Sequence, residues 1–143
     1  MQTLETRRGE STVADAMILA PKVCGPETTV AEAAAVLRNE HVHAVLVVDG
    51  SALLAVVERA DLAAPPGSPA RRAGRLGDRV TGPDADLETA RQAMRAAGRR
   101  RLAVVDAGGA LLGLLCLKRS GLGFCSDDGI RARAAERRRT GAR

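Results

Sequence analysis

The stretch LVVDGSALLAVVERADL, residues 46–62, decides the fold that we predict for this chain. It contains two apolar runs, rich in Val and Leu, that are short enough to be strands. Asp49 and Gly50 separate the runs, and this dipeptide is typical of a tight hairpin turn. The polar segment that follows, residues 58–64, predicts a short helix. Residues 46–62 therefore indicate a β-hairpin that leads into a helical turn.

A second hairpin of the same kind lies near the other end of the chain, in RLAVVDAGGALLGLLCLKRSGL, residues 101–122. Displacing the sequence by 57 positions superimposes the two hairpins, and the agreement extends upstream of them. The aligned pairs include Pro26 with Pro83, Val30 with Leu87, Leu37 with Met94, Val47-Val48-Asp49 with Val104-Val105-Asp106 and, after one extra turn residue, Leu53-Leu54-Ala55 with Leu111-Leu112-Gly113. The chain is therefore an internal repeat, a feature that determines the whole fold.

Each copy predicts the same elements in the same order. In the first copy, apolar residues at helical spacing predict a helix over 30–40, which Thr28 or Thr29 can cap. The predicted strands of this copy are 44–48 and 52–57; the second copy predicts a helix over 87–97 and strands over 102–105 and 110–117. Short strands at 22–24 and 79–81, and short helices from residue 58 and from about Lys118, complete two β-α-β-β-α units.

Both strands of each hairpin are apolar throughout, so we expect both faces of each small sheet to be buried. One face packs on the unit's own helices, and the other has to meet its twin, since neither copy is large enough to cover itself. The predicted fold class is α/β, with two tandem repeats packed as a pseudo-twofold pair. The predicted domains are an N-terminal tail (1–11), repeat 1 (12–64), a Pro-, Gly- and Arg-rich linker (65–75), repeat 2 (76–125) and a basic C-terminal tail (126–143).

The composition limits the class of protein. Of the 143 residues 45% are apolar, yet Phe124 is the single aromatic residue, so the core has to consist of Ala, Val, Leu and Met. No run approaches the roughly 20 apolar residues of a membrane-spanning helix, and residues 1–12 lack the apolar centre of a signal peptide. Three cysteines, an odd number without a pairing pattern, fit a reducing compartment. We therefore expect a cytoplasmic protein without a membrane partner.

The net charge of +5 resides in the C-terminal tail. Residues 130–143 contain six Arg and one Glu, whereas residues 1–129 contain sixteen basic and sixteen acidic side chains. The tail lacks aromatic residues that stack on bases, so nucleic acid is not an expected partner. Residues 126–139 can form a helix capped by Ser126 or a solvated tail, and the sequence leaves both open. No catalytic constellation is present, so we do not expect an enzyme.

The paired layout resembles the cystathionine-β-synthase (CBS) domain pair, or Bateman module, over residues 12–122. The matching segments are TVADAM (12–17), APKVCGPETTVAEAAAVL (20–37) and the two hairpin stretches quoted above. The resemblance implies a non-catalytic regulatory or sensor module that binds an adenosine-type ligand (AMP, ATP or adenosylmethionine) in a cleft between the repeats. It also implies a homodimer, and it leaves the protein partner unknown.

The family's ligand signature is a Gly, two apolar residues, a Ser or Thr, two variable residues and an Asp, whose carboxylate accepts hydrogen bonds from ribose hydroxyls. The first copy reads Ala55-Val-Val-Glu58-Arg-Ala-Asp61, so the acid is kept, but Glu58 replaces the hydroxyl and would repel a phosphate. The second reads Gly113-Leu-Leu-Cys116-Leu-Lys-Arg119, in which Cys116 replaces the hydroxyl and Arg119 replaces the acid. Arginine has donors only, so Arg119 suits a phosphate or carboxylate rather than a ribose.

Ten positions form the candidate ligand-binding set: Asp61, Glu58, Ala55, His43, Val45, Gly113, Cys116, Arg119, Thr81 and Arg101. Asp61 has a second interpretation as a first-turn helix acid, and Arg119 can instead pair with Glu58 or Asp127. Because neither copy keeps the whole signature, an alternative function stays open: an interaction module that has lost nucleotide binding and acts through its dimer and basic tail.

The cysteines and histidines carry weaker hypotheses. The spacing of Cys24, His41 and His43 matches no standard zinc pattern, so we assign no metal. Cys116 is expected to be a buried small apolar residue. Cys125 lies at the edge of the second repeat, where we expect it to be more exposed and open to oxidation.

Overall fold

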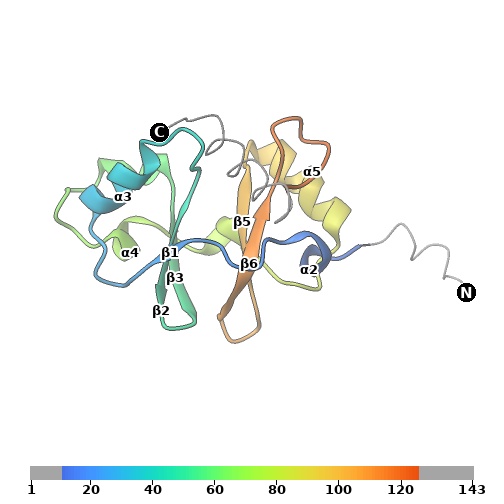
Figure 1. The fold of residues 1–143 in the computed structure, drawn as a ribbon, viewed down its shortest axis with the longest axis horizontal. Helices are drawn as coiled ribbons and strands as arrows, with labels where there is room; N and C mark the ends of the chain where they lie inside the picture. The colour runs from blue at the N-terminus through green and yellow to red at the C-terminus, as the bar shows by residue number, and fades with distance from the viewer. Residues whose placement is uncertain (1–10, 126–143) are drawn as a thin grey trace, which may run out of the picture.

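Two small sheets, one from each half of the chain, form the framework of the computed structural model (Figure 1). The structure describes residues 11–125. In each sheet a two-residue strand runs parallel to the first hairpin strand, which is antiparallel to the second. Helices pack beside both sheets, which confirms the predicted α/β class and the two tandem repeats.

The elements follow the predicted order. Those of repeat 1 are β1 (Val23–Cys24), α3 (Val30–Leu37), β2 (Val45–Asp49), β3 (Ala52–Val57) and the 3-10 helix η1 (Arg59–Ala63). Those of repeat 2 are β4 (Val80–Thr81), α5 (Leu87–Ala97), β5 (Arg101–Val105) and β6 (Leu111–Cys116). Three short helices precede the two-residue strands: α2 (Val13–Ala16) before β1, and α4 (Ala70–Ala73) and the 3-10 helix η2 (Gly77–Arg79) before β4.

Side-chain caps fix where the two main helices begin. The Thr29 hydroxyl accepts a hydrogen bond from the Glu32 N–H (3.1 Å), and the Glu32 carboxylate accepts one from the Thr29 N–H (2.9 Å). The Asp86 carboxylate accepts a hydrogen bond from the Thr89 N–H (2.9 Å) at the start of α5. These bonds satisfy N–H groups that a helix start leaves free. Of the two threonines predicted as the cap of α3, Thr29 is the one used.

Helix α3 ends at Leu37, before the predicted end at residue 40. The guanidinium of Arg59 donates hydrogen bonds to the carbonyls of Leu37 (2.6 Å) and Asn39 (3.0 Å). The Asn39 side chain in turn accepts a hydrogen bond from the His41 N–H (2.9 Å). Because these groups satisfy carbonyls that a helix end leaves free, the chain can leave the helix early and turn toward β2.

The segment that begins repeat 1 in the sequence packs on repeat 2 in space (Figure 1). Ile18 pairs with Leu114 of β6 through two backbone hydrogen bonds of 2.8 and 3.0 Å. Val13 of α2 is fully buried among the side chains of α5, β5 and β6. The boundary predicted at residue 12 describes where the sequence repeat begins and stays a prediction. In space, residues 13–18 belong to the packing of repeat 2.

The linker of residues 65–75 packs on repeat 1 in the equivalent way. Arg75 pairs with Val56 of β3 through backbone hydrogen bonds of 3.0 and 3.2 Å. Ala70 of α4 is fully buried in the core of repeat 1. The segment is therefore part of the folded unit, because the backbone of Arg75 pairs with β3 and the side chain of Ala70 lies in the core.

The core has three parts, and one of them joins the repeats. Each repeat has its own core between sheet and helices, built around Ala33, Leu37 and Val47 in repeat 1 and around Ala90, Met94 and Val104 in repeat 2. The third part lies between the two sheets; its buried members are Leu46, Val48, Leu53, Val56 and Ala103. This arrangement confirms that both faces of the apolar strands are buried and that each sheet meets its twin.

The short helix predicted from about Lys118 is absent, and this prediction was wrong. The chain instead turns back after β6, so that Phe124 lies opposite Leu117 in an antiparallel bridge. The Lys118 N–H donates to the Gly123 carbonyl (2.9 Å), and Gly121 supplies a positive φ of 76°. Glycine adopts that conformation without strain, so the turn competes successfully with a helix.

Within residues 11–125, no helix is long and apolar enough to cross a membrane. The predicted alternatives for residues 126–139, a capped helix or a solvated tail, lie outside the described residues.

Candidate ligand-binding cleft

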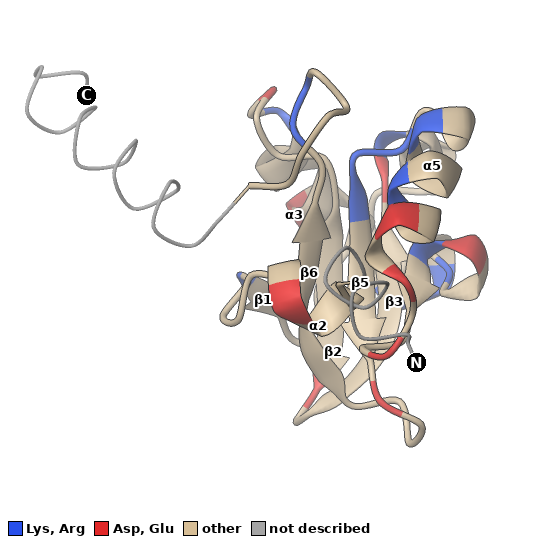
Figure 2. Ribbon diagram, turned by 90° about the vertical axis from the view of Figure 1, so that its right-hand side faces the viewer, with Lys and Arg blue, Asp and Glu red and all other residues tan. Residues whose placement is uncertain are grey.

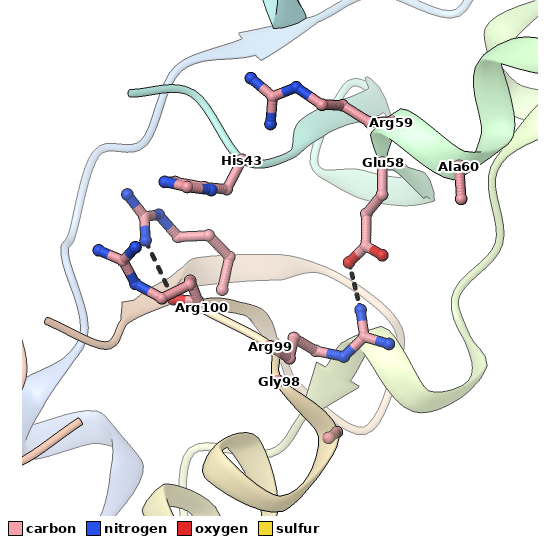
Figure 3. Close-up of a pocket in the computed structure, with 9 residues that line it drawn as sticks. His43, Glu58, Arg59, Ala60, Gly98, Arg99 and Arg100 are labelled. Atoms are coloured by element: carbon pink, nitrogen blue, oxygen red, sulfur yellow. Dashed lines mark hydrogen bonds and ion pairs between the residues drawn. The ribbon is translucent and has the colours of Figure 1, made fainter. Parts of the chain in front are cut away.

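A pocket of about 260 Å³ opens between the two repeats (Figure 3). Repeat 1 contributes His43, which precedes β2, and the segment from Glu58 that leads into η1. Repeat 2 contributes the end of α5 and the start of β5. The lining residues are His43, Glu58, Arg59, Ala60, Ala97, Gly98, Arg99, Arg100 and Arg101.

The pocket carries a positive charge. Four arginines and one glutamate line it, and Figure 2 shows basic residues gathered where α5 ends and β5 begins. Burial, as the largest cause, and the charges of Arg101, Arg100 and Arg59 together lower the pKa of His43 to about 4. His43 is therefore neutral at pH 7, and the excess of arginines favours an anionic ligand.

Glu58, the one acid of the pocket, is already neutralised. Its carboxylate forms an ion pair with Arg99, toward which it points in Figure 3. The other carboxylate oxygen, Oε1, lies 3.4 Å from Nε of Arg79. The repulsion of phosphate that Glu58 predicts from the sequence is thus offset by two guanidinium groups that the sequence repeat does not reveal.

Asp61, the predicted ribose ligand, is occupied by Arg79. Nη1 of Arg79 donates to Asp61 Oδ2 (2.5 Å) and to the Val56 carbonyl (2.7 Å), and Nη2 donates to Asp61 Oδ1 (3.3 Å). The Glu58 N–H also donates to Asp61 Oδ2 (2.8 Å). The side chain of Arg79 is 2% exposed and that of Asp61 is 9% exposed, so this is a buried ion pair. The bond to Glu58 supports the second interpretation of Asp61, as an acid that caps η1.

The contacts of Asp61 determine its protonation. Burial by itself raises the pKa of the carboxyl, but the hydrogen bonds from Arg79 and from the Glu58 N–H, together with the charge of Arg79, hold the pKa below its usual range. Asp61 is therefore an ionised carboxylate whose donors come from the protein itself.

The network extends to the outside of repeat 2. Arg99 Nη2 lies 3.2 Å from Asp78 Oδ2, and Arg75 Nε lies 3.3 Å from Asp78 Oδ1. These outer pairs are largely exposed at Asp78, whose side chain is 61% exposed, so they contribute little to stability. Their consequence is that Arg99 is held between two acids and is not free to bind a ligand.

Arg100 and Arg101 are the arginines available for an anion. Nε of Arg100 donates to the Leu117 carbonyl (2.9 Å), and Nη1 of Arg101 donates to the Arg100 carbonyl (3.1 Å). Within residues 11–125, neither side chain forms an ion pair with a carboxylate. Burial lowers the pKa of Arg101 from its usual value. Charged groups held in a partly buried site without a counterion suit a phosphate or a carboxylate.

Three of the ten predicted residues line this pocket: His43, Glu58 and Arg101. Four others are packed inside the fold: Ala55 and Val45 in the strands of repeat 1, and Gly113 and Cys116 in β6. Thr81 lines a separate groove between β4 and α5, and Arg119 is exposed in the turn after β6. The structure therefore does not bring the two signature stretches together in one site.

Gly113 has a structural reason to be glycine. A Cβ atom at this position would lie 2.6 Å from the Ile18 carbonyl oxygen and 2.8 Å from Met17 Sδ. The space beside Gly113 is thus filled by residues 17–18, which cross from repeat 1 onto β6 and are called the crossing segment below. The signature role of the glycine, to leave room for a ligand, is not what its surroundings here require.

Sequence reasoning missed Arg79, Arg99 and Arg100. The run Gly98-Arg99-Arg100-Arg101 was a usable signal, because three successive arginines between a helix and a buried strand have to be accommodated at a sheet edge. Arg79 gave no such signal, since its acidic partners lie about twenty positions away in the sequence. Its pairing depends on how the repeats pack.

Residues 11–125 also contain no group of three His, Cys, Asp or Glu side chains arranged to hold a metal ion. The Cys24 thiol of the weak zinc hypothesis donates instead to the Leu46 carbonyl (3.5 Å).

Fold and pocket together define a two-repeat α/β module with a basic cleft between the repeats. The CBS-domain family model matches residues 13–64 and 80–119. The chain belongs to the CBS-domain family, whose members are generally regulatory rather than catalytic modules. The predicted resemblance is thereby confirmed.

Solved structures show the same fold. CBSX2 in complex with AMP is 27% identical, with a TM-score of 0.63 over 88% of this chain and 98% of that one. The CBS domains of a transcriptional regulator from Streptococcus pneumoniae are 18% identical, with a TM-score of 0.60 over 74% and 92%. The cytosolic domain of the Mg²⁺ channel MgtE, in complex with ATP, is 24% identical, with a TM-score of 0.53 over 68% and 43%. No curated protein matches the sequence.

Proposed function

We propose that this chain is a non-catalytic regulatory module that binds an adenosine-type ligand in the pocket between its CBS repeats. The observation that carries the proposal is the pair Arg100 and Arg101, which face the pocket without an acidic partner among the described residues. Adenine nucleotides are ligands of two proteins with the same fold, CBSX2 with AMP and MgtE with ATP.

The charge of the pocket refines the ligand class. Among AMP, ATP and adenosylmethionine, the phosphate-bearing nucleotides complement the arginines, whereas a sulfonium cation does not. In this proposal Arg100 and Arg101 bind the phosphate through charge-assisted hydrogen bonds. Asp61 binds the ribose only after its bond to Arg79 is exchanged, because both carboxylate oxygens are already in use.

Isothermal titration calorimetry tests the proposal. We expect AMP and ATP to bind, adenosylmethionine to bind more weakly, and the affinity to fall as salt is added. Arg101→Met removes one charge-assisted contact and is expected to weaken AMP binding about 10-fold or more, from the typical strength of a hydrogen bond to a charged group. Arg119→Met is the matched control, since Arg119 lies in the exposed turn outside the pocket, and should bind AMP as the parent does.

A different result would reject the assignment. Equal loss in both variants would mean that general surface charge, and not the pocket, attracts the nucleotide. Tighter binding of adenosylmethionine than of AMP would place the ligand elsewhere in the cleft.

The alternative, an interaction module that has lost nucleotide binding, is favoured by the buried pair Arg79–Asp61. This pair leaves the signature acid of repeat 1 without a free acceptor, and repeat 2 has Arg119 in place of the acid. In that case none of the nucleotides produces heat of binding at millimolar concentration. Action through a homodimer and through the basic tail belongs to this alternative.

A further inference from the structure

Two cysteines face each other where the chain turns back after β6. The Cys125 N–H donates a hydrogen bond to the Cys116 carbonyl (2.7 Å). Leu117 and Phe124, the next residues inward, form an antiparallel bridge. In this register Cys116 and Cys125 are directly opposite one another on neighbouring strands.

Directly opposed residues have the right separation for a disulfide. Their Cα atoms lie about 4.5–5.5 Å apart in antiparallel strands, and a disulfide needs Cα atoms about 4.4–6.8 Å apart. Opposed side chains also project to the same face of the sheet. Register and direction therefore both permit an S–S bond without a change in the backbone pairing.

The two side chains already interact as thiols. Burial, as the largest cause, and a hydrogen bond between the two cysteine side chains together raise the pKa of Cys116 to about 11. Cys116 is 2% exposed, whereas Cys125 is only half-buried. The two thiols thus differ in access: an external reagent meets Cys125 first.

We propose that Cys116 and Cys125 are a redox pair that a small disulfide oxidant, such as oxidised glutathione, converts to an intramolecular disulfide. The Cys125 thiolate attacks one sulfur of the oxidant, and a glutathione thiolate leaves. Cys116 then loses its proton to water and attacks the Cys125 sulfur, which breaks the mixed disulfide and releases the second glutathione. The protein gives up two protons and two electrons, and the oxidant takes them up as two thiols.

The position of the pair connects it to the pocket. Arg101 lies opposite Cys116 in the register of β5 and β6. Leu117, the residue between Cys116 and the turn, accepts a hydrogen bond from Nε of Arg100 at its carbonyl, and its N–H donates to the Arg100 carbonyl (2.9 Å). A disulfide closes the hairpin of residues 116–125 and so restrains the segment that positions both pocket arginines.

Peptide mapping of the full chain tests the proposal directly. Trypsin cleaves after Lys22, Arg38, Arg101, Lys118, Arg119 and Arg131, so the three cysteines fall in three peptides: 23–38, 102–118 and 120–131. After equilibration of the native chain with oxidised glutathione and alkylation of the remaining thiols, we expect peptides 102–118 and 120–131 to be joined. Reduction should separate them, and peptide 23–38 should carry the alkyl group throughout.

Two variants make the test specific. Cys24→Ser should still give the joined peptides, and Cys125→Ser should leave Cys116 alkylated only after unfolding, because it is buried. The proposal is overturned if native chain accumulates a stable glutathione adduct on Cys125 while Cys116 stays a thiol. It is equally overturned if Cys24 appears in the joined peptides, since the opposed pair would then not be the preferred one.

Discussion

The last strand of repeat 1 and the last strand of repeat 2 lead into different structures. After β3, the acids Glu58 and Asp61 begin the 3-10 helix η1 and are held by buried or half-buried arginines. After β6, Cys116 is followed by a turn that brings Cys125 back beside it. The same β-α-β-β construction therefore ends in an ionic network in one repeat and in a thiol-bearing hairpin in the other.

This difference determines which side chains surround Lys22 and Arg79, the residues that precede β1 and β4. Arg79 precedes β4 and is 2% exposed, whereas Lys22, its equivalent one repeat earlier, precedes β1 and is exposed. Arg79 can be buried because repeat 1 supplies Asp61 and Glu58 as counterions. Repeat 2 has Cys116 and Arg119 at the equivalent positions, so a buried cation at residue 22 would have no partner.

Replacing Arg79 and Lys22 should give the largest difference in stability between equivalent positions of the two repeats. We expect Arg79→Met to lower the free energy of unfolding by about 3 kcal/mol, because it leaves the buried carboxylate of Asp61 without its partner. Lys22→Met removes an exposed charge and should change stability by less than about 0.5 kcal/mol. Urea denaturation at pH 7 measures both values.

The two variants also define what would contradict this account. A small and equal decrease in the free energy of unfolding of both variants would mean that water reaches Asp61 and replaces the guanidinium of Arg79. A large loss in Lys22→Met would mean that residue 22 has an acidic partner outside residues 11–125.

A second contrast concerns the two segments that pair with the last strands: residues 17–18 on β6 and residues 74–75 on β3. In repeat 2 the strand carries the small residue, Gly113, and the segment that lies on it carries Met17. In repeat 1 the strand carries Ala55, and the segment at the equivalent position carries Gly74, where a Cβ atom would lie 2.6 Å from the Val56 carbonyl oxygen. Each close approach of two backbones thus uses one glycine, but on opposite partners.

Substituting the glycine of repeat 2 tests that contact. Gly113→Ala is expected to cost about 1–3 kcal/mol, the usual range for overpacking, because its Cβ would meet the rigid Ile18 carbonyl. Gly82→Ala is the control: Gly82 has open space around its Cβ position and no positive φ, so we expect a change of less than about 0.5 kcal/mol. Thermal unfolding of both variants checks the order, and an unchanged midpoint for Gly113→Ala would show that the crossing segment yields.

The sequence predicted those parts of the fold that local patterns determine. Helix α5 occupies the predicted range 87–97, and β3 occupies the predicted range 52–57. In both, local signals agree: Asp86 caps the helix, Gly98 ends it with a φ of 68°, and Asp49-Gly50 turns the hairpin. The repeat itself then predicted that the two sheets would bury each other.

The parts that the sequence did not predict depend on contacts between distant segments. The crossing of Ile18 onto β6 leaves no local trace, because a backbone pairing needs no particular side chain. The same holds for Asp61, whose sequence context fits a ribose ligand until Arg79 is brought beside it. The helix expected from Lys118 failed because the hairpin bonds of Cys125 and Gly123 compete with helical ones.

The third and smallest expected effect is the pH dependence of the stability that Asp61 contributes; repeat 2 has Arg119 at the equivalent position. The native pKa of Asp61 lies below its unfolded value of about 3.9, because the bonds from Arg79 and Glu58 outweigh the effect of burial. The stability that this carboxylate contributes is therefore complete above pH 4 and is lost as the pH falls through the native pKa. We expect the difference in unfolding free energy between the parent and Asp61→Asn to narrow below pH 4. For the equivalent position in repeat 2, the difference between the parent and Arg119→Met should not change there, since arginine does not titrate in that range. A constant difference for Asp61→Asn would mean that the carboxylate stays ionised throughout or that its bond to Arg79 contributes nothing.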